Sequence, residues 1–570
     1  MSTSDFVDIE FNGRSVTARK GETVASALIG AGFRVLRTSE NGANRGIFCG
    51  MGVCQDCLVE IDGKSNLRAC MTKIDGPISV RRQQSGRRTA RYTLARPAIA
   101  VQDVQVEIPE ILVIGAGPAG LSAAMAARRS GAGVKVLDER SNAGGQFYKQ
   151  VTVSGPDFPP ADQQHRDGAT LFEKCVDLDV QFEFETTVWG GFENREFIAS
   201  NRAGTVRYNP QRVIIATGAY ERAHVVPGWT LPGVMTTGAA QTLWRSSRRL
   251  AGQRVVVAGN GPLNLQLATE LTDGGAEVVA LVEAARPNRL GAVVDVGRMF
   301  LSSREFLIQG IGFIRRLKAA GVNLLNDHVV AGIEATSSGL RVKLTGSNQR
   351  TSLQTLEFDT DVVCLGYGFE PSNELARAVG CEQDYDPVRQ ELKLRLDDVG
   401  GTTVQSVYAV GDCAGMGGAM VALSQGEIAG YAAGQSLGYP LSNDHRSRLG
   451  MARRTMARQR RFQRALWRIY EYPRVNLEHA KPETAFCRCE EVSVGSVLSA
   501  LDNGCVSTGE VKRRTRLGMG RCQGRYCVPV LQHIMANRAG TTVDSNSGFA
   551  PRVPVKPVAI EDLLRSMSNE

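Results

Sequence analysis

Eight of the 13 cysteines gather in two groups, and closely spaced thiols are the residues here best suited to metal or redox chemistry. The first residues, MSTSDFVDIEF, contain no basic segment followed by an apolar run, so we expect a cytoplasmic protein whose thiols stay reduced. Clustered reduced cysteines indicate metal ligands rather than disulfides. The two groups are Cys49, Cys54, Cys57 and Cys70 near the N-terminus, and Cys487, Cys489, Cys522 and Cys527 near the C-terminus.

The first group reads FCGMGVCQDC and then RAC, which is C-x4-C-x2-C with a fourth cysteine further along. This spacing is typical of a plant-type [2Fe–2S] loop, in which four thiolates hold two irons. Gly50 and Gly52 would let the backbone wrap closely and point amides at the sulfurs. Zinc is the alternative, but zinc sites favour paired C-x2-C motifs or added histidines, which this segment lacks.

The second group reads FCRCEEV and later GMGRCQGRYC, with 32 residues between Cys489 and Cys522. This is a C-x-C pair followed by a C-x4-C pair. Gly520 and Gly524 lie beside the second pair and would suit a cluster cradled by backbone amides. The spacing by itself indicates only a metal site, with zinc as the generic alternative.

Residues 110–145 contain a strand, a glycine-rich turn that opens a helix, and a second strand. The turn is Gly115-Ala116-Gly117-Pro118-Ala119-Gly120. Its first glycine allows the tight turn, its second lets a pyrophosphate approach the backbone, and its third allows close helix packing. Glu139, nineteen residues past Gly120, is predicted to accept hydrogen bonds from ribose hydroxyls. The turn predicts a dinucleotide site without choosing between FAD and NAD.

A second fold of the same kind occupies Arg254–Glu283, with Gly259 and Gly261 in its turn. Asn264 stands where the third glycine is expected, at the point where the helix packs against the strand. This departure puts NAD(P) binding in question. A retained scaffold and a site for another nucleotide are the alternatives, and the acidic Glu283 would favour NADH over NADPH.

Three further segments resemble the two-dinucleotide-domain flavoproteins that include the pyridine-nucleotide-disulfide reductases. The resemblance implies FAD at the first turn and places Asp412 at the ribityl and phosphate region. No cysteine directly follows Gly144-Gly145, and the flavoprotein region has no C-x-x-C pair, so disulfide redox chemistry is not expected. The cofactor-binding residues in these segments are Gly145, Gln146, Thr217, Gly218, Gly411 and Asp412.

Both cysteine groups lie in segments that resemble known modules. Residues 4–82, with the string RGIFCGMGVCQDC, resemble a β-grasp ferredoxin domain. The string TRLGMGRCQGRYC resembles the small helical [2Fe–2S] domain of bacterioferritin-associated ferredoxin. The second resemblance implies a second [2Fe–2S] cluster.

The strings LPGVMTTGAAQTLW, AGNGPLNLQLA and CLGYGFEPSNELARAVG resemble the α-type subunit of heteromeric bacterial amine and amino-acid dehydrogenases. That family includes D-hydroxyproline dehydrogenase, opine oxidase and hydrogen cyanide synthase. The resemblance covers nearly all of residues 110–560, with the small ferredoxin fused at the N-terminus. It implies a partner FAD subunit of the D-amino-acid-oxidase type, from which this chain passes electrons onward through FAD and two [2Fe–2S] clusters. A self-sufficient NAD(P)H reductase and an iron-handling scaffold are the alternatives.

The expected fold is multidomain α/β. The chain is 42% hydrophobic and 22% charged with a net charge of +9, and its arginine clusters lack a nucleic-acid reading module. Its longest apolar run contains the glycines of the first turn, so no membrane span is expected. The expected domains are a ferredoxin-like domain at 1–84, a linker at 85–108, an FAD domain at 109–225 and 346–440, a nucleotide-type domain at 226–345, a helical connector at 441–483, a second cluster domain at 484–540 and a tail at 541–570.

Overall fold

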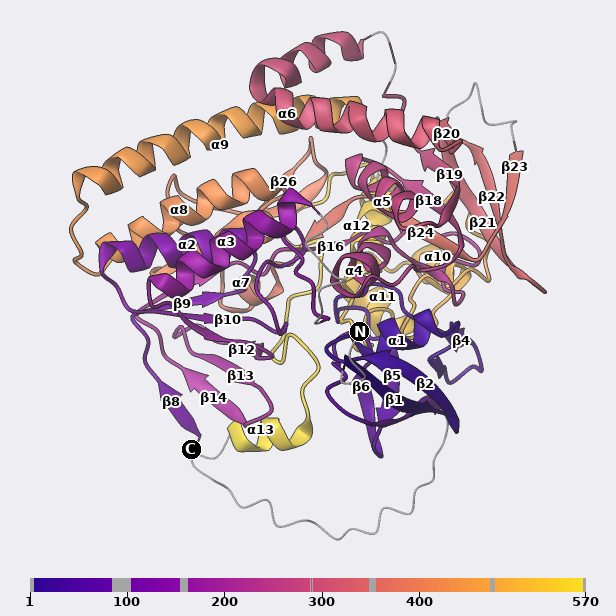
Figure 1. Cartoon of the computed structure of the whole chain (residues 1–570), viewed down its shortest axis with the longest axis horizontal. Coiled ribbons are helices and arrows are strands. Elements are labelled where there is room, and N and C mark those ends of the chain that lie inside the picture. Colours follow the sequence, from indigo (N-terminus) through magenta and orange to yellow (C-terminus); the bar gives the residue numbers. More distant parts are fainter. Residues whose placement is uncertain are drawn as a thin grey trace.

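The computed structural model describes residues 5–84, 104–153, 162–287, 289, 291–347, 355–471 and 477–566. The expected α/β architecture is confirmed: a β-grasp domain, two Rossmann-like domains and a small helical domain (Figure 1). The N-terminal domain lies beside the second Rossmann-like domain and the helical domain, as Figure 1 shows in indigo, magenta and yellow. Within the described residues, no helix has both the length and the apolar character needed to cross a lipid bilayer.

The N-terminal domain is a mixed sheet wrapped around one helix. β1 alternates buried and exposed residues and pairs antiparallel with β2 across a turn at Asn12 and Gly13, both with positive φ. β7 then pairs parallel with β1, which is the central pairing of a β-grasp sheet. Its elements are β1 (Phe6–Phe11), β2 (Arg14–Arg19), α1 (Val24–Gly30), β3 (Arg37–Thr38), β4 (Asn44–Arg45), β5 (Leu58–Ile61), β6 (Lys64–Arg68) and β7 (Ser79–Gln84).

The first Rossmann-like domain is a parallel sheet of order β11-β10-β9-β15-β28, with α2 and α8 packed together on it. A second sheet of order β12-β13-β14-β8 covers the domain. The elements are β8 (Gln105–Glu107), β9 (Ile111–Ile114), α2 (Pro118–Ser130), β10 (Val134–Leu137), α3 (Gln163–Asp177), β11 (Gln181–Glu183), β12 (Thr187–Gly191), β13 (Phe197–Ser200), β14 (Thr205–Tyr208), β15 (Arg212–Ile215), β16 (Ala219–Glu221), β25 (Phe369–Pro371), α7 (Glu374–Ala378), β26 (Gln383–Asp386), β27 (Glu391–Leu394), β28 (Val407–Ala409), the 3-10 turn η2 (Gly411–Cys413) and α8 (Ala419–Ser436).

The inserted domain has a parallel sheet of order β17-β24-β18-β19-β20 and an antiparallel sheet of order β21-β22-β23. Strands β18 and β24 are buried along most of their length, as expected for a sheet covered on both faces. The elements are β17 (Val234–Thr236), α4 (Thr237–Ser247), β18 (Arg254–Gly259), α5 (Pro262–Asp273), β19 (Glu277–Glu283), α6 (Ala292–Ala319), β20 (Asn323–Asn326), β21 (His328–Thr336), β22 (Gly339–Gly346), β23 (Thr355–Thr360) and β24 (Val362–Gly366).

Two expected boundaries differ from this arrangement. The sequence predicts the return to the first Rossmann-like domain at residue 346, but β24 pairs with β17 and β18, so the inserted domain continues to Gly366. The sequence also predicts a linker that reaches residue 108, but β8 pairs parallel with β14 and belongs to the domain that follows. Both strands come from distant segments of sequence, and only the sheet reveals their pairing. Residues 85–103 of the expected linker lie outside the described residues.

The connector is helical, as expected. α9 (Asn443–Ile469) packs along α6 and α8, and in Figure 1 it lies at the upper left of the molecule, below the first part of α6. The C-terminal domain contains α10 (Val494–Asp502), α11 (Thr508–Thr515) and α12 (Val528–Ala539). The tail follows and ends in α13 (Ile560–Ser566), which lies beside β14 of the first Rossmann-like domain.

Candidate functional site

The first cysteine group forms a buried site in the loop between β4 and β5, completed by the cysteine that follows β6. The four thiols contact one another as two pairs, Cys49 with Cys54 and Cys57 with Cys70. Burial alone would raise the pKa of the Cys49 thiol, but hydrogen bonds from Cys54 and from the Met51 and Val53 amides lower it to about 6. Burial and the same hydrogen bond raise the pKa of the Cys54 thiol, so the two thiols of this pair act as donor and acceptor.

The second cysteine group joins two loops of the helical domain. Cys489 Sγ lies 3.8 Å from Cys487 Sγ and 3.5 Å from Cys522 Sγ, and Cys527 contacts Cys487. Hydrogen bonds from the Cys489 and Cys527 thiols, helped by backbone amides, lower the pKa of Cys487 to about 3. Gly520 lies against this site, because a Cβ there would stand 2.5 Å from Cys489 Sγ.

The glycines beside the cysteines are expected from the sequence to donate amides to the sulfurs. The Gly524 amide does so toward Cys522. At the first site, the donors to Cys49 are the amides of its neighbours rather than those of the expected glycines. Gly50 instead permits a close approach, because it has φ +61° and its Cβ would lie 2.9 Å from Ala239 Cα.

Both cysteine sites fit a binuclear cluster. A [2Fe–2S] cluster takes two cysteines at each iron, and the first site presents two contacting pairs of buried thiols. Among the described residues, no three His, Cys, Asp or Glu side chains meet closely enough to hold one metal ion. The second site presents its four thiols as a row, in which Cys489 meets Cys487 and Cys522 and Cys487 also meets Cys527, and so again offers four sulfurs for two irons. When bound, each cluster would supply one-electron redox chemistry.

The first glycine turn has the geometry of a dinucleotide cradle. Gly115 has φ +109° and packs against the backbone of Ala216, where a Cβ would collide. Above Gly117, at the start of α2, the space is open except for Gly145, whose Cα lies 3.9 Å from the position of a Cβ. The segment 144–145 closes one side, since the Gly144 amide donates to the Ala116 carbonyl at 2.8 Å.

Two neighbouring carboxylates at the end of β10 have different surroundings. Asp138 reaches the glycine turn and accepts from the Ala116 amide at 2.6 Å. Glu139, the residue predicted to meet the ribose, instead pairs with Lys556 of the tail at 2.8 Å and with Arg68 of the β-grasp domain at 3.9 Å. Burial opposes its charge, but these cations lower the pKa of Glu139 to about 2.

The distant segments of the expected FAD site converge on this turn. Gly411 packs against the start of α2, because its Cβ would lie 2.8 Å from Ala119 Cβ. Asp412 Oδ1 accepts the Gly417 and Gly418 amides at 2.9 and 3.0 Å, and so holds the loop that begins α8. Thr217 donates to the Ser372 carbonyl at 2.6 Å. Open space over Gly117 at a helix N-terminus fits the pyrophosphate of FAD.

The second glycine turn is built differently. Asn264 is buried in place of the third glycine, accepts from the Thr237 hydroxyl at 2.8 Å and donates to the Gly366 carbonyl at 3.0 Å. It thereby ties α5 to α4 and β24. The carboxylate of Glu283 accepts the Gly261 amide at 2.9 Å, and burial raises its pKa to about 8.

The chain itself reaches this second turn. The Asn260 side chain donates to the carbonyl of Tyr470, just beyond α9, at 2.9 Å. The end of α9 is held there by Arg468, which pairs with Asp295 of α6 at 2.7 Å. Arg289 also donates to the Arg468 carbonyl. A nucleotide entering the second cradle would meet this segment.

Two buried titratable groups lie beside α4, near the first cysteine site. Lys149 donates to Gln241 at 2.8 Å, and burial lowers its pKa to about 7. Burial raises the pKa of Glu221 to about 7, although its carboxylate accepts the Gly238 amide at 2.9 Å. Neither residue belongs to a recognisable motif, so sequence reasoning misses both. Both can exchange a proton near neutral pH.

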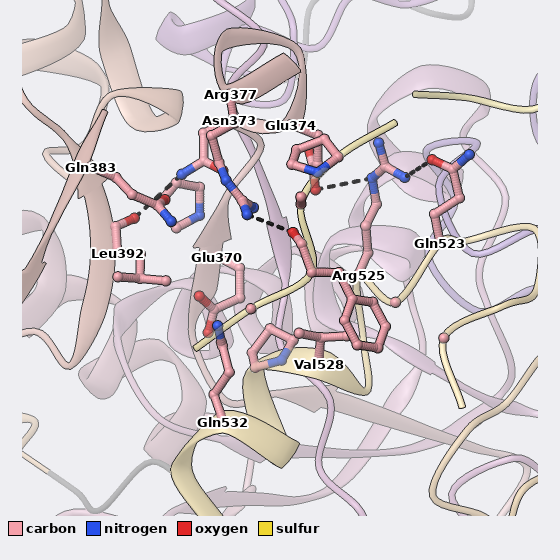
Figure 2. Close-up of a pocket in the computed structure, with 18 of the residues that line it drawn as sticks. Glu370, Asn373, Glu374, Arg377, Gln383, Leu392, Gln523, Arg525, Val528 and Gln532 are labelled. Atoms are coloured by element: carbon pink, nitrogen blue, oxygen red, sulfur yellow. Dashed lines mark hydrogen bonds and ion pairs between the residues drawn. The ribbon is translucent and has the colours of Figure 1, made fainter. Parts of the chain in front are cut away.

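A cavity of about 370 Å³ separates the first Rossmann-like domain from the second cysteine site (Figure 2). Arg525 crosses its wall and pairs with Glu374 at 3.2 Å, while Arg377 donates to the Phe549 carbonyl at 2.6 Å. The buried Gln383 carries a side-chain oxygen with no hydrogen-bond partner. The wall of the cavity is therefore formed jointly by the first Rossmann-like domain, the loop that carries Cys522 and Cys527, and the C-terminal tail.

Comparisons with known proteins agree with this arrangement. Residues 109–426 match the pyridine nucleotide-disulphide oxidoreductase family, residues 4–85 match the 2Fe-2S iron-sulfur cluster binding domain, and residues 486–537 match the BFD-like [2Fe-2S] binding domain. The resemblances of both cysteine groups to known modules are thus confirmed, and the cofactors are FAD and two [2Fe–2S] clusters.

Two relatives cover most of the chain. It is 34% identical to an opine oxidase subunit of Agrobacterium tumefaciens over 80% of this chain and 91% of that protein. It is 28% identical to the hydrogen cyanide synthase subunit HcnB of Pseudomonas aeruginosa over 78% of this chain and 96% of that protein. The crystal structure of L-proline dehydrogenase from P. horikoshii shares the fold, with a TM-score of 0.70 and 18% identity over 99% of this chain and 98% of that one. The chain therefore belongs to the pyridine nucleotide-disulphide oxidoreductase family, together with this opine oxidase subunit, and carries a [2Fe–2S] domain on each side of the flavoprotein core.

Proposed function

We propose that this chain is the electron-transferring subunit of a dehydrogenase complex that oxidises an amine or amino acid of the imino acid or opine class. Electrons come from a partner FAD subunit of the D-amino-acid-oxidase type and leave through the FAD and the two clusters of this chain. The relatives from opine oxidase and hydrogen cyanide synthase are themselves named as subunits, which supports an assembly of this kind.

The observation that carries the proposal is that residues of this chain contact the second glycine turn, where a nucleotide would bind. Asn264 fills the position of the third glycine, and the Tyr470 carbonyl is bonded to Asn260 in the turn itself. A nicotinamide dinucleotide needs that turn for its pyrophosphate. Electrons from NAD(P)H are therefore the less favoured source, and the partner flavoprotein is the favoured one. We propose that the Asp138 carboxylate accepts the hydrogen bonds of the ribose hydroxyls in the FAD site, because it lies at the first glycine turn.

The residues of this chain bind and orient the cofactors. The backbone of the first turn and the start of α2 would hold the pyrophosphate of FAD, and the two sets of cysteines would hold the clusters. The flavin would supply the conversion between two-electron and one-electron transfer. Lys149 and Glu221 are placed to take up or release a proton at Nζ and at the carboxylate near neutral pH.

An anaerobic titration of the purified protein tests the source of electrons. NADH and then NADPH are added while the flavin absorbance is recorded, and dithionite follows as the control reductant. We expect dithionite alone to bleach the flavin and the cluster bands. Bleaching by NADH within the mixing time would instead establish a reductase.

The partner and substrate are tested on the complex isolated through a tag on this chain. We expect a second flavoprotein to copurify and to let opines, imino acids such as proline, or glycine bleach the flavin of this chain. A complex that is reduced by none of these amines, or a chain that purifies alone, would count against the proposed assembly.

A further inference from the structure

The two cysteine loops face each other across a buried ion pair. Asp56 lies between Cys54 and Cys57 of the first site, and Arg488 lies between Cys487 and Cys489 of the second. Arg488 Nε donates to Asp56 Oδ2 at 2.7 Å. Side-chain exposure is 4% for Arg488 and 0% for Asp56, so water does not separate the two loops at this point.

Both members of the pair are fixed by further contacts. Arg37 donates to Asp56 Oδ1 at 2.9 Å, and Arg488 Nη1 donates to the Trp229 carbonyl at 2.6 Å. The Arg488 guanidinium also lies over the Phe48 ring, 3.7 Å from its centroid. A planar guanidinium held by hydrogen bonds and an aromatic face has one orientation, which a flexible lysine would not reproduce.

Aromatic rings join the same two loops beside this pair. Phe48, next to Cys49, meets Tyr526, next to Cys527, with ring centroids 5.4 Å apart. Tyr526 also meets Tyr220, which follows the Thr217 turn of the FAD site, at 5.8 Å. The Tyr526 ring is buried within the same apolar cluster as cysteines of both sites. One packed aromatic row therefore connects the flavin-type domain with both cysteine loops.

A contribution to folding stability does not explain why the buried position between the two loops holds the Arg488–Asp56 ion pair. A buried ion pair costs more desolvation than it regains unless its geometry is very good, and apolar residues of similar size often serve as well. The same interface already has another ion pair, Arg45 with Glu491 at 2.6 Å. A fully partnered arginine between two ligand cysteines fixes the position of those ligands instead.

We propose that Arg488 and Asp56 are positioning residues that hold the two cysteine sites in a fixed relative position. The electron spins of the two clusters then interact, and the charge of each cluster affects the reduction potential of the other. The ion pair then fixes the ligand cysteines of each site relative to those of the other site. The proposal rests on the two cluster sites and not on the identity of the amine donor or partner flavoprotein.

Electron paramagnetic resonance of the full chain, reduced with dithionite, tests the coupling. In the unmodified protein we expect a spectrum that differs from the sum of two isolated cluster signals, with spin–spin broadening at each. R488Q and D56N should keep full iron and sulfide and lose this broadening. Cluster potentials from a dye-mediated redox titration should shift in both variants.

R45Q is the matched control, because it removes an ion pair of the same interface and keeps the hydrogen bonds of Arg37 and Arg488 to Asp56, and it should leave the broadening intact. R488K is the second variant if R488Q loses iron; it keeps the charge, and we expect it to retain both clusters with weakened broadening. An unmodified spectrum that equals the sum of two separate signals would overturn the proposal. So would unchanged broadening and potentials in iron-replete Arg488 variants. Since dithionite supplies the electrons, neither result depends on the proposed partner.

Discussion

Replacing Asn264 by alanine tests whether this residue is a structural substitute for the missing glycine of the second turn. The side chain makes two buried hydrogen bonds, to the Thr237 hydroxyl at 2.8 Å and to the Gly366 carbonyl at 3.0 Å. Their loss leaves the buried Thr237 hydroxyl without this acceptor and leaves the Gly366 carbonyl with the Asn260 amide, 2.8 Å away, at about 1–2 kcal/mol for each lost hydrogen bond. We expect the inserted domain to lose about 2–4 kcal/mol of stability.

Hydrogen exchange measures this loss locally, because a chain of several domains does not unfold in one step. A loss of about 2–4 kcal/mol corresponds to roughly thirty- to a thousand-fold faster exchange of the protected amides. We expect this acceleration in β18 and α5, beside the substitution, and none in β9 of the other domain. Thr237→Val and the double variant complete a mutant cycle, with an expected coupling of about 1 kcal/mol.

The functional half of the prediction uses Asn264→Gly, which restores the expected glycine. We expect NADH still not to bleach the flavin, because the Tyr470 carbonyl remains bonded to Asn260. Rapid bleaching of the glycine variant by NADH would refute the reasoning, since it would show that Asn264 alone kept the nucleotide out. Exchange rates that do not change in β18 and α5 would refute the structural role.

Three more changes have specific expected outcomes. Cys57→Ser should halve the iron content and abolish the signal of one cluster. Cys505→Ser lies outside both sites and should keep the full iron content and both cluster signals. Equal iron in the two variants would contradict the assignment of Cys57 as a cluster ligand. Gly520→Ala should displace Cys489, because its Cβ would stand 2.5 Å from that sulfur, and lose the second cluster, whereas Gly310→Ala meets nothing within 4 Å and should be neutral by the same measurement. Burial raises the pKa of Glu283 from 4.5 to about 8, so the native chain binds more protons than the unfolded chain between these values and stability falls as pH rises. Glu283→Gln should flatten this dependence between about pH 5 and 8, measured as hydrogen-exchange protection of β18 and β19 relative to the intrinsic rate at each pH, and an unchanged slope would exclude the shift.

Much of the site could be predicted because its signals are local. The cysteine spacings and the first glycine turn each place several residues within one loop, and the geometry of a short loop follows from its own sequence. The choice between Asp138 and Glu139 is different. Adjacent residues leaving a strand point in opposite directions, so a spacing rule that is accurate to one residue cannot decide which of the two carboxylates faces the turn. Glu139 forms an ion pair with Lys556 of the tail, more than four hundred residues later in the chain.

The sequence by itself determined the cofactor modules and their order, because a [2Fe–2S] loop and a dinucleotide turn need few residues at fixed spacing. Only the tertiary structure decided how these modules meet. The contact of Tyr470 with the second turn and the pairing of Arg488 with Asp56 join segments separated by more than two hundred residues. Such contacts are set by the packing of whole domains, whose relative placement no local spacing encodes. The same packing turns two separate iron–sulfur motifs into neighbours and brings Tyr470 against the second glycine turn.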